Sequence, residues 1–202
     1  RSALASASGL RAGRRACPLA QRVLAGARTL PGSGSMLAAM LRYRALFHNS
    51  EPPPALALEY YRVLGGTILG YNDARAKLSA LVAESPHDLN ARLALAQIQT
   101  YRDVSRAQGL EELRRLAGAD TQPLIRNQAI AAWRATLSWV PIVGASIPLY
   151  MDWLAQHPDD AAIVTRLEKA RSVQAIIDEG NTGQKALSCW GTDVWMPPLR
   201  RS

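Results

Sequence analysis

Apolar residues recur every three or four positions through the middle of the chain, the spacing that places side chains on one face of a helix. In "LNARLALAQIQT" this face consists of Leu89, Leu93, Ala96 and Thr100, and in the next stretch of Leu110, Leu113, Leu116 and Ala117. Extended along the chain, the pattern predicts helices at about 53–66, 72–85, 89–101, 104–117, 122–138, 146–157 and 160–178.

Residues that begin helices support these boundaries. Pro52, Pro53 and Pro54 suit a helix entrance, where a missing backbone N–H costs little. Asp88 and Asp160 stand where an N-cap carboxylate accepts backbone N–H bonds. The pattern therefore predicts short helices joined by tight turns.

The helical pattern repeats at an offset of 72 residues. The stretch "EYYRVLGGTILGYNDARAKLSALVAESPHD" aligns without a gap on "AAWRATLSWVPIVGASIPLYMDWLAQHPDD", so that Tyr61 meets Trp133, Leu81 meets Trp153, and Asp88 meets Asp160. This offset is about twice the ~34-residue period of the tetratricopeptide repeat, a helix-turn-helix unit. Since one helix pair cannot bury its apolar face alone, the next pair must cover it.

The stretch "GYNDARAKLSALVAESPHD" resembles the second half of the tetratricopeptide consensus. Gly70 and Tyr71 match its turn, Ala74 and Leu78 its helix, and Pro86 its exit. The resemblance implies an all-α fold, a tetratricopeptide-type α-solenoid wound as a right-handed superhelix over residues 50–178. We expect its core to include Leu78, Leu81, Leu93, Leu113, Trp133, Tyr150 and Trp153.

Charge and composition set the two ends apart from the repeats. Residues 1–49 are rich in Ala, Gly, Ser and Arg and are expected to be disordered, and residues 179–202 to form an irregular tail. The first 50 residues hold eight of the 24 Lys and Arg and no acid, which leaves 16 basic and 16 acidic residues beyond them.

The basic segment has several interpretations: a transit peptide, an arm that contacts phosphates, or flanking sequence. Because the chain begins at Arg1, we expect a fragment or a processed product. We expect no nucleic-acid binding by the charge-balanced repeats. We also expect no transmembrane segment, since no run of about 18 apolar residues occurs.

A search for catalytic chemistry predicts neither an enzyme nor a metal or cofactor site. His48, His87 and His157 lack metal-ligand spacing, and the last two are expected to be solvated at turns. Paired acids such as Glu111 and Glu112 are expected on solvated faces. No phosphate-binding glycine motif is present.

Aromatic residues offer two interpretations, inter-helix packing or stacking on a sugar chain. Packing is favoured for Tyr61, Trp133 and Trp153, because the repeat places them at equivalent apolar positions. Trp139 has no such equivalent, and both interpretations stay open for it.

Three phrases carry a more specific resemblance: "ALALEYYRVLGG", "DLNARLALAQIQTYRDVSRAQGLEELRRLAG" and "SIPLYMDWLAQHPDDAAI". In this order they resemble the periplasmic repeat region of the bacterial cellulose synthase operon protein C family. The resemblance implies a non-enzymatic scaffold in the periplasm, associated in the intact family protein with the outer membrane. Its expected partners are the other proteins of the cellulose synthase complex or the exported glucan chain.

The repeat register predicts a binding face. With first helices starting at Leu89 and Ala161, tetratricopeptide units commonly turn the second, fifth and ninth positions toward the concave side. The polar residues chosen by this register are Glu59, Asn90, Gln97, Gln128 and Lys169. Two alternatives remain: these are ordinary exposed residues, or the chain is a cytosolic helical adaptor or regulator unrelated to cellulose.

Overall fold

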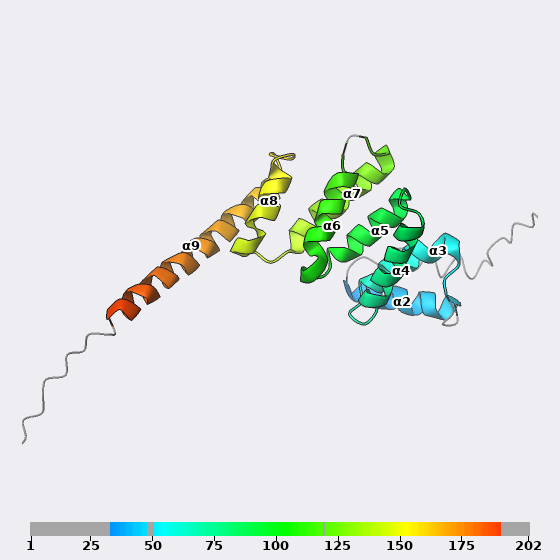
Figure 1. Ribbon diagram of the computed structural model, residues 1–202, viewed down its shortest axis with the longest axis horizontal. Coiled ribbons are helices and arrows are strands. Elements are labelled where there is room, and N and C mark those ends of the chain that lie inside the picture. Colours follow the sequence, from blue (N-terminus) through cyan, green and yellow to red (C-terminus); the bar gives the residue numbers. More distant parts are fainter. Residues whose placement is uncertain (1–32, 48–50, 119, 191–202) are drawn as a thin grey trace, which may run out of the picture. The chain divides into compact units, whose positions relative to one another are not determined.

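The computed structural model describes residues 33–47, 51–118 and 120–190, and the side chains within them except those of 33–37 and 183–190. These residues form helices and turns without a strand. The helices are α2 (Ser33–Phe47), α3 (Pro54–Gly65), α4 (Tyr71–Glu84), α5 (Leu89–Gln99), α6 (Asp103–Leu116), α7 (Pro123–Trp139), α8 (Ile147–Leu154) and α9 (Ala161–Trp190) (Figure 1). A single 3₁₀ turn, Gly144–Ser146, precedes α8. The all-α prediction is confirmed.

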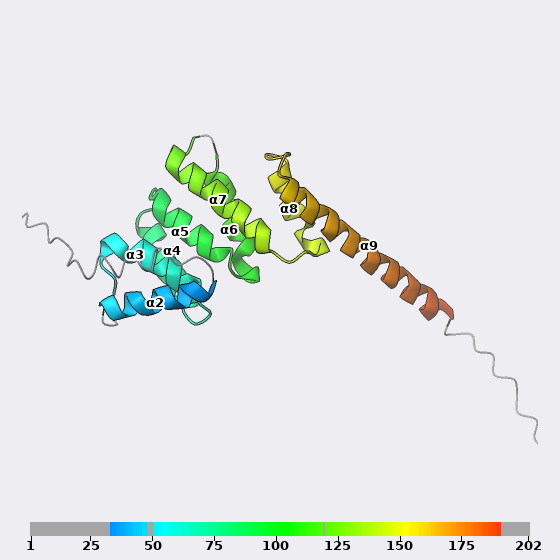
Figure 2. The same cartoon turned by 180° about the vertical axis from the view of Figure 1, so that it is seen from behind.

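The chain divides into two compact units, residues 1–125 and 126–202. In the first unit, α3 packs against α4 and α5 against α6, while α5 also contacts both α3 and α4 (Figures 1 and 2). Each helix pair thus covers the next, as the repeat requires. The shared core includes Tyr61, Leu64, Ala74, Leu78 and Ile98.

Helix α2 lies in the segment expected to be disordered, and here the structure corrects the expectation. Ala39, Met40, Tyr43 and Phe47 are buried, and they form one helical stripe that packs against α3. The segment "SMLAAMLRYRALF" folds because this stripe outweighs the basic charge on its other face. Residues 1–32 lie outside the described part of the chain.

Two glycines allow close helix approach in the first unit. A Cβ on Gly65 of α3 would lie 2.7 Å from Ile98 Cγ2 on α5, and one on Gly109 of α6 would lie 2.7 Å from the Ala96 carbonyl oxygen. Both distances are shorter than a carbon atom can tolerate. The helices can therefore cross at these points only because the side chains are absent.

The second unit has an aromatic core. Trp133 of α7 and Trp153 of α8 meet edge to face, with ring centroids 5.0 Å apart. Tyr150 is also buried, and Ile163, Leu167 and Ala170 form the buried face of α9. Helix α8 lies along the first part of α9 (Figures 1 and 2). The packing interpretation of Trp133 and Trp153 is confirmed.

Both predicted N-caps are confirmed. Asp88 Oδ1 accepts the backbone N–H groups of Asn90 at 2.9 Å and Ala91 at 3.3 Å. Asp160 Oδ1 accepts that of Ile163 at 3.3 Å. The repeat offset therefore carries helix initiation as well as core positions.

Two expectations differ from the structure. Leu81 was expected in the core but is only half-buried, because it lies at the margin of the first unit's cluster. The last helix was expected to end near residue 178, but α9 continues to Trp190 and so covers part of the expected irregular tail. Gly180 weakens a helix without ending it, and no proline occurs before Pro197.

Candidate functional site

The predicted binding residues occupy three different settings. Asn90 and Gln97 are two turns apart on one side of α5, where Asn90 is exposed and Gln97 half-buried. Glu59 on α3 is half-buried and accepts a hydrogen bond from the Tyr43 hydroxyl of α2. Gln128 and Lys169, on α7 and α9 of the second unit, are exposed. Their role in binding stays a prediction.

The opposite side of α5 borders a hollow that the sequence patterns did not predict. At 3.6 residues per turn, Arg92, Leu95 and Gln99 point roughly opposite to Asn90 and Gln97. They line a groove of about 530 Å³ together with Val82, Pro86, Gln108, Glu111, Glu112 and Arg115. We call this the α4–α6 groove, after the three helices that line it.

An ion-pair network forms one wall of the groove. The Arg92 guanidinium contacts Glu112 Oε1 through Nε at 2.7 Å and Nη2 at 2.6 Å. Arg115 reaches Glu112 Oε2 at 3.6 Å and Glu111 Oε1 at 3.2 Å. The Glu112 side chain is only 20% exposed, so the expectation that this acid is solvated is wrong. It binds α5 to α6 through Arg92.

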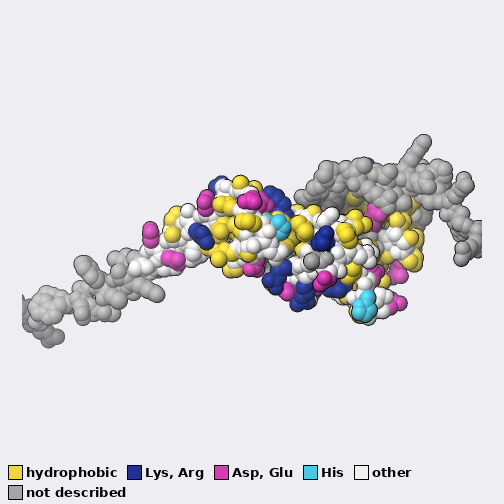
Figure 3. All heavy atoms as spheres, turned by 90° about the horizontal axis from the view of Figure 1, so that it is seen from above, with side chains coloured by type: hydrophobic (Ala, Val, Ile, Leu, Met, Phe, Trp, Pro, Cys, Tyr) yellow, Lys and Arg dark blue, Asp and Glu magenta, His cyan; other side chains and the backbone are white. Residues whose placement is uncertain are grey.

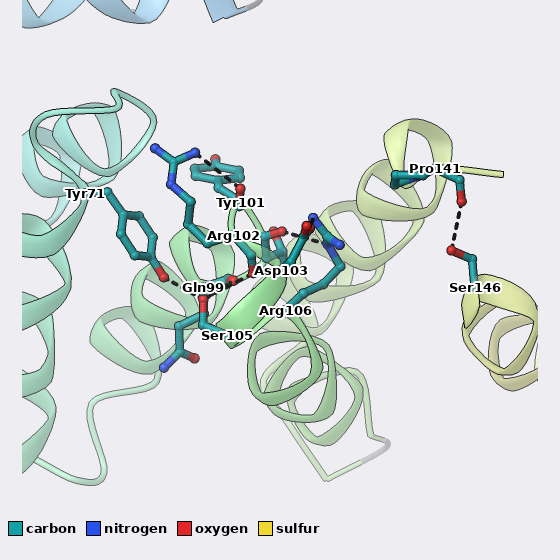
Figure 4. Close-up of polar contacts among 10 residues, drawn as sticks. Tyr71, Gln99, Tyr101, Arg102, Asp103, Ser105, Arg106, Pro141 and Ser146 are labelled. Atoms are coloured by element: carbon teal, nitrogen blue, oxygen red, sulfur yellow. Dashed lines mark hydrogen bonds and ion pairs between the residues drawn. The ribbon is translucent and has the colours of Figure 1, made fainter. Parts of the chain in front are cut away.

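A buried hydrogen-bond chain holds the same helices near the turns. The Tyr71 hydroxyl on α4 and Ser105 Oγ on α6 lie 2.6 Å apart, and Ser105 Oγ donates to the Gln99 carbonyl at 2.8 Å (Figure 4). Arg102 covers the Tyr71 ring at 5.0 Å and donates to the Thr67 carbonyl at 3.2 Å. These contacts fix the positions of α4, α5 and α6, and thereby the shape of the groove.

In the second unit, polar side chains gather around Asp160. Its carboxylate accepts two bonds from Arg134, at 3.0 and 3.1 Å, and one from Trp153 Nε1 at 3.1 Å. Burial acts to raise the pKa of Asp160, but the bonds from Arg134, the Ile163 N–H and Trp153 together hold that pKa below its ordinary value.

The two turn histidines differ. His87 is exposed, as expected. His157 is half-buried, and its ring stacks on Trp153 at 3.8 Å, so the expectation of a solvated side chain is wrong for it. The stacking places His157 in the aromatic core rather than in a site.

Neither metal-binding clusters nor membrane spans occur among the described residues. No group of three or more His, Cys, Asp or Glu side chains there could hold a metal ion. None of the helices described combines the length and apolar character needed to cross a bilayer. On the face seen in Figure 3, basic and acidic side chains are interspersed.

Comparison with known proteins places the repeats in a family. No family model matches the chain. Over 176 residues, 87% of the chain, it is 55% identical to cellulose synthase 2 operon protein C of Komagataeibacter xylinus. The chain is homologous to part of cellulose synthase operon protein C. Relatives of that name include one from Xanthomonas axonopodis pv. citri, 38% identical over 150 residues.

The chain is much shorter than these relatives. It spans 14% of the Komagataeibacter protein and 10% of the Xanthomonas one, while the matches cover 87% and 74% of the chain. A solved structure, the flexible tandem repeat domain of the corresponding bacterial cellulose synthase component, has a TM-score of 0.42 and 22% sequence identity. That comparison covers 75% of the chain and 61% of the solved chain.

Proposed function

We propose that the chain is a non-catalytic repeat scaffold of the bacterial cellulose synthesis and export machinery. The observation that carries the proposal is the 55% identity to a cellulose synthase operon protein C over 87% of the chain. A scaffold suits the fold because stacked helix pairs present extended surfaces on both sides of a continuous core.

The proposed location is the periplasm, next to the outer membrane. Support comes from the relatives' cellulose operon names and from the resemblance of the three sequence phrases to a periplasmic repeat region. In that place the scaffold would connect other proteins of the operon to the glucan that leaves the cell.

The first-helix line is the proposed contact for those proteins. It comprises Glu59, Asn90, Gln97, Gln128 and Lys169, which are exposed or half-buried. One acid, one base and three neutral amides favour hydrogen bonding over capture of a highly charged polymer. Because none of the five lies in the core, they can be changed without opening a cavity.

The combined Glu59→Ala, Gln97→Ala, Gln128→Ala and Lys169→Ala variant tests this line. We expect a nearly unchanged thermal midpoint and weaker binding to purified proteins of the same operon, measured by calorimetry. A matched control replaces four exposed second-helix residues, Asn72, Ser79, Gln108 and Asp152, by Ala. Unchanged affinity in the correctly folded first variant would reject the line as a binding face.

A further inference from the structure

The α4–α6 groove is a polar surface for which the repeat packing has no evident use. Its walls come from three helices, and its volume of about 530 Å³ is within the range of small-ligand sites. It faces away from the first-helix line on α5, so both surfaces can be occupied at once.

The charges that line the groove cancel. Arg92 and Arg115 balance Glu111 and Glu112, and each arginine contacts at least one of these acids. A lining without net charge gives no electrostatic drive for a nucleic acid or another polyanion. The chemistry therefore favours a neutral ligand.

The hydrogen-bonding groups of the groove suit hydroxyls that both donate and accept. A guanidinium has five N–H donors, and the bonds from Arg92 to Glu112 use two of them. The pairing also holds the guanidinium and carboxylate in place before a ligand arrives. The amides of Gln99 and Gln108 add further donors and acceptors.

Aliphatic surface completes the lining. Val82, Pro86 and Leu95 can pack against the C–H faces of pyranose rings, but they form no deep pocket for a large apolar anchor of a peptide. A chain of sugar rings alternates such faces with hydroxyl edges. These features match a neutral sugar polymer better than a peptide.

We propose that the α4–α6 groove binds a short stretch of β-linked glucan, the polymer for which the relatives' operon is named. This inference rests on the proposed function and gives the scaffold a second face, distinct from its protein-binding line. Arg92 and Gln108 contact ring hydroxyls, and Leu95 packs beneath a ring.

Calorimetric titration of the full chain with cellohexaose tests the site, with maltohexaose as the α-linked control. Arg92→Lys keeps the charge but loses the planar fork, and Gln108→Ala removes an exposed amide. Each should weaken cellohexaose binding about threefold to tenfold, the effect of one lost hydrogen bond. Arg114→Gln is the matched control, because Arg114 pairs with Glu111 but does not line the groove.

The alternatives give different results. Absence of saturable cellohexaose binding by the folded chain, equal binding of maltohexaose, or loss of binding in Asn90→Ala/Gln97→Ala but not in the groove variants would each overturn the site. If the groove variants instead weaken binding of operon proteins, the groove takes a polypeptide and the glucan assignment is wrong. Operon-protein binding that survives these variants leaves the scaffold function standing whether or not glucan binds.

Discussion

At the scale of single residues, Asp160 performs three tasks. It caps α9, holds Arg134 by two bonds, and accepts the indole N–H of Trp153. These contacts join the helix start to the aromatic core of the second unit. The shared carboxylate makes the stability of this unit depend on its ionisation.

We therefore expect Asp160 to contribute a pH-dependent part of the stability. Its pKa is lowered in the folded chain, so between the ordinary value of about 3.9 and the folded value the unfolded state binds more protons. The contribution is present above pH ~4 and is lost as the pH falls through the folded pKa. Asp160→Asn keeps a good N-cap and should cost about 1 kcal/mol or less at pH 7.

Urea unfolding measured from pH 6 to pH 3 checks this expectation. The wild-type chain should lose more stability on acidification than Asp160→Asn, and the difference isolates Asp160 from other carboxylates. Asp159→Asn, at an exposed neighbour, should follow the wild type. Parallel curves for wild type and Asp160→Asn would show that Asp160 does not cause the dependence.

Trp133 is the largest side chain at the contact between α7 and α8. It is 2% exposed and meets Trp153 edge to face. Trp133→Ala should lower the free energy of unfolding by roughly 3–5 kcal/mol, because a large ring leaves a cavity. Urea unfolding followed by far-UV circular dichroism measures the loss.

Trp139 provides the matched control, since it lies on the same helix and is 44% exposed. Its replacement by Ala should cost far less. A loss below about 1 kcal/mol for Trp133→Ala would place that ring at the surface and reopen the sugar-stacking interpretation.

At the scale of helices, α5 carries both surfaces of the scaffold. Apolar residues such as Leu93, Ala94 and Ile98 are buried on it. Asn90 and Gln97 lie on one flank, and Arg92 and Gln99 lie on another. One eleven-residue helix can serve this way because small residues let its neighbours approach closely.

Gly109 shows how much this closeness matters. A Cβ there would meet the Ala96 carbonyl oxygen at 2.7 Å and the Thr100 nitrogen at 2.9 Å, so α5 and α6 would have to separate. Although Ala is the better helix former, Gly109→Ala should destabilise the chain by about 1–3 kcal/mol. The thermal midpoint and urea unfolding both report the loss.

Gly180 on α9 offers a matched control, because nothing lies within 4 Å of an added Cβ. Gly180→Ala should raise the stability of that helix by about 0.5–1 kcal/mol. Equal effects of the two replacements would mean that the crossing of α5 and α6 does not depend on the missing side chain.

At the scale of the whole molecule, charge and function separate along the sequence. The excess of Arg is confined to the first 50 residues, and the rest of the chain has equal numbers of acids and bases. The groove repeats this balance locally. A neutral polymer can therefore slide along such a scaffold without being held by strong electrostatic attraction.

The sequence alone determined the helix pairs, their caps and most of the core. The apolar period of Leu78 or Leu113 and the carboxylates of Asp88 and Asp160 act within a few residues, so local spacing is sufficient to predict them. The family resemblance followed from the same repeats. Helix α2 was missed because the basic, Ala-rich composition around it masks the periodic signal of Met40, Tyr43 and Phe47.

Only the tertiary structure decided the groove. Arg92 and Glu112 are 20 residues apart, and their contact depends on how closely α5 and α6 cross, which Gly109 permits. The same holds for Tyr71 and Ser105, 34 residues apart. Helical periodicity fixes the direction of a side chain on its own helix, whereas the distance between side chains on different helices is set by the packing of the core between them.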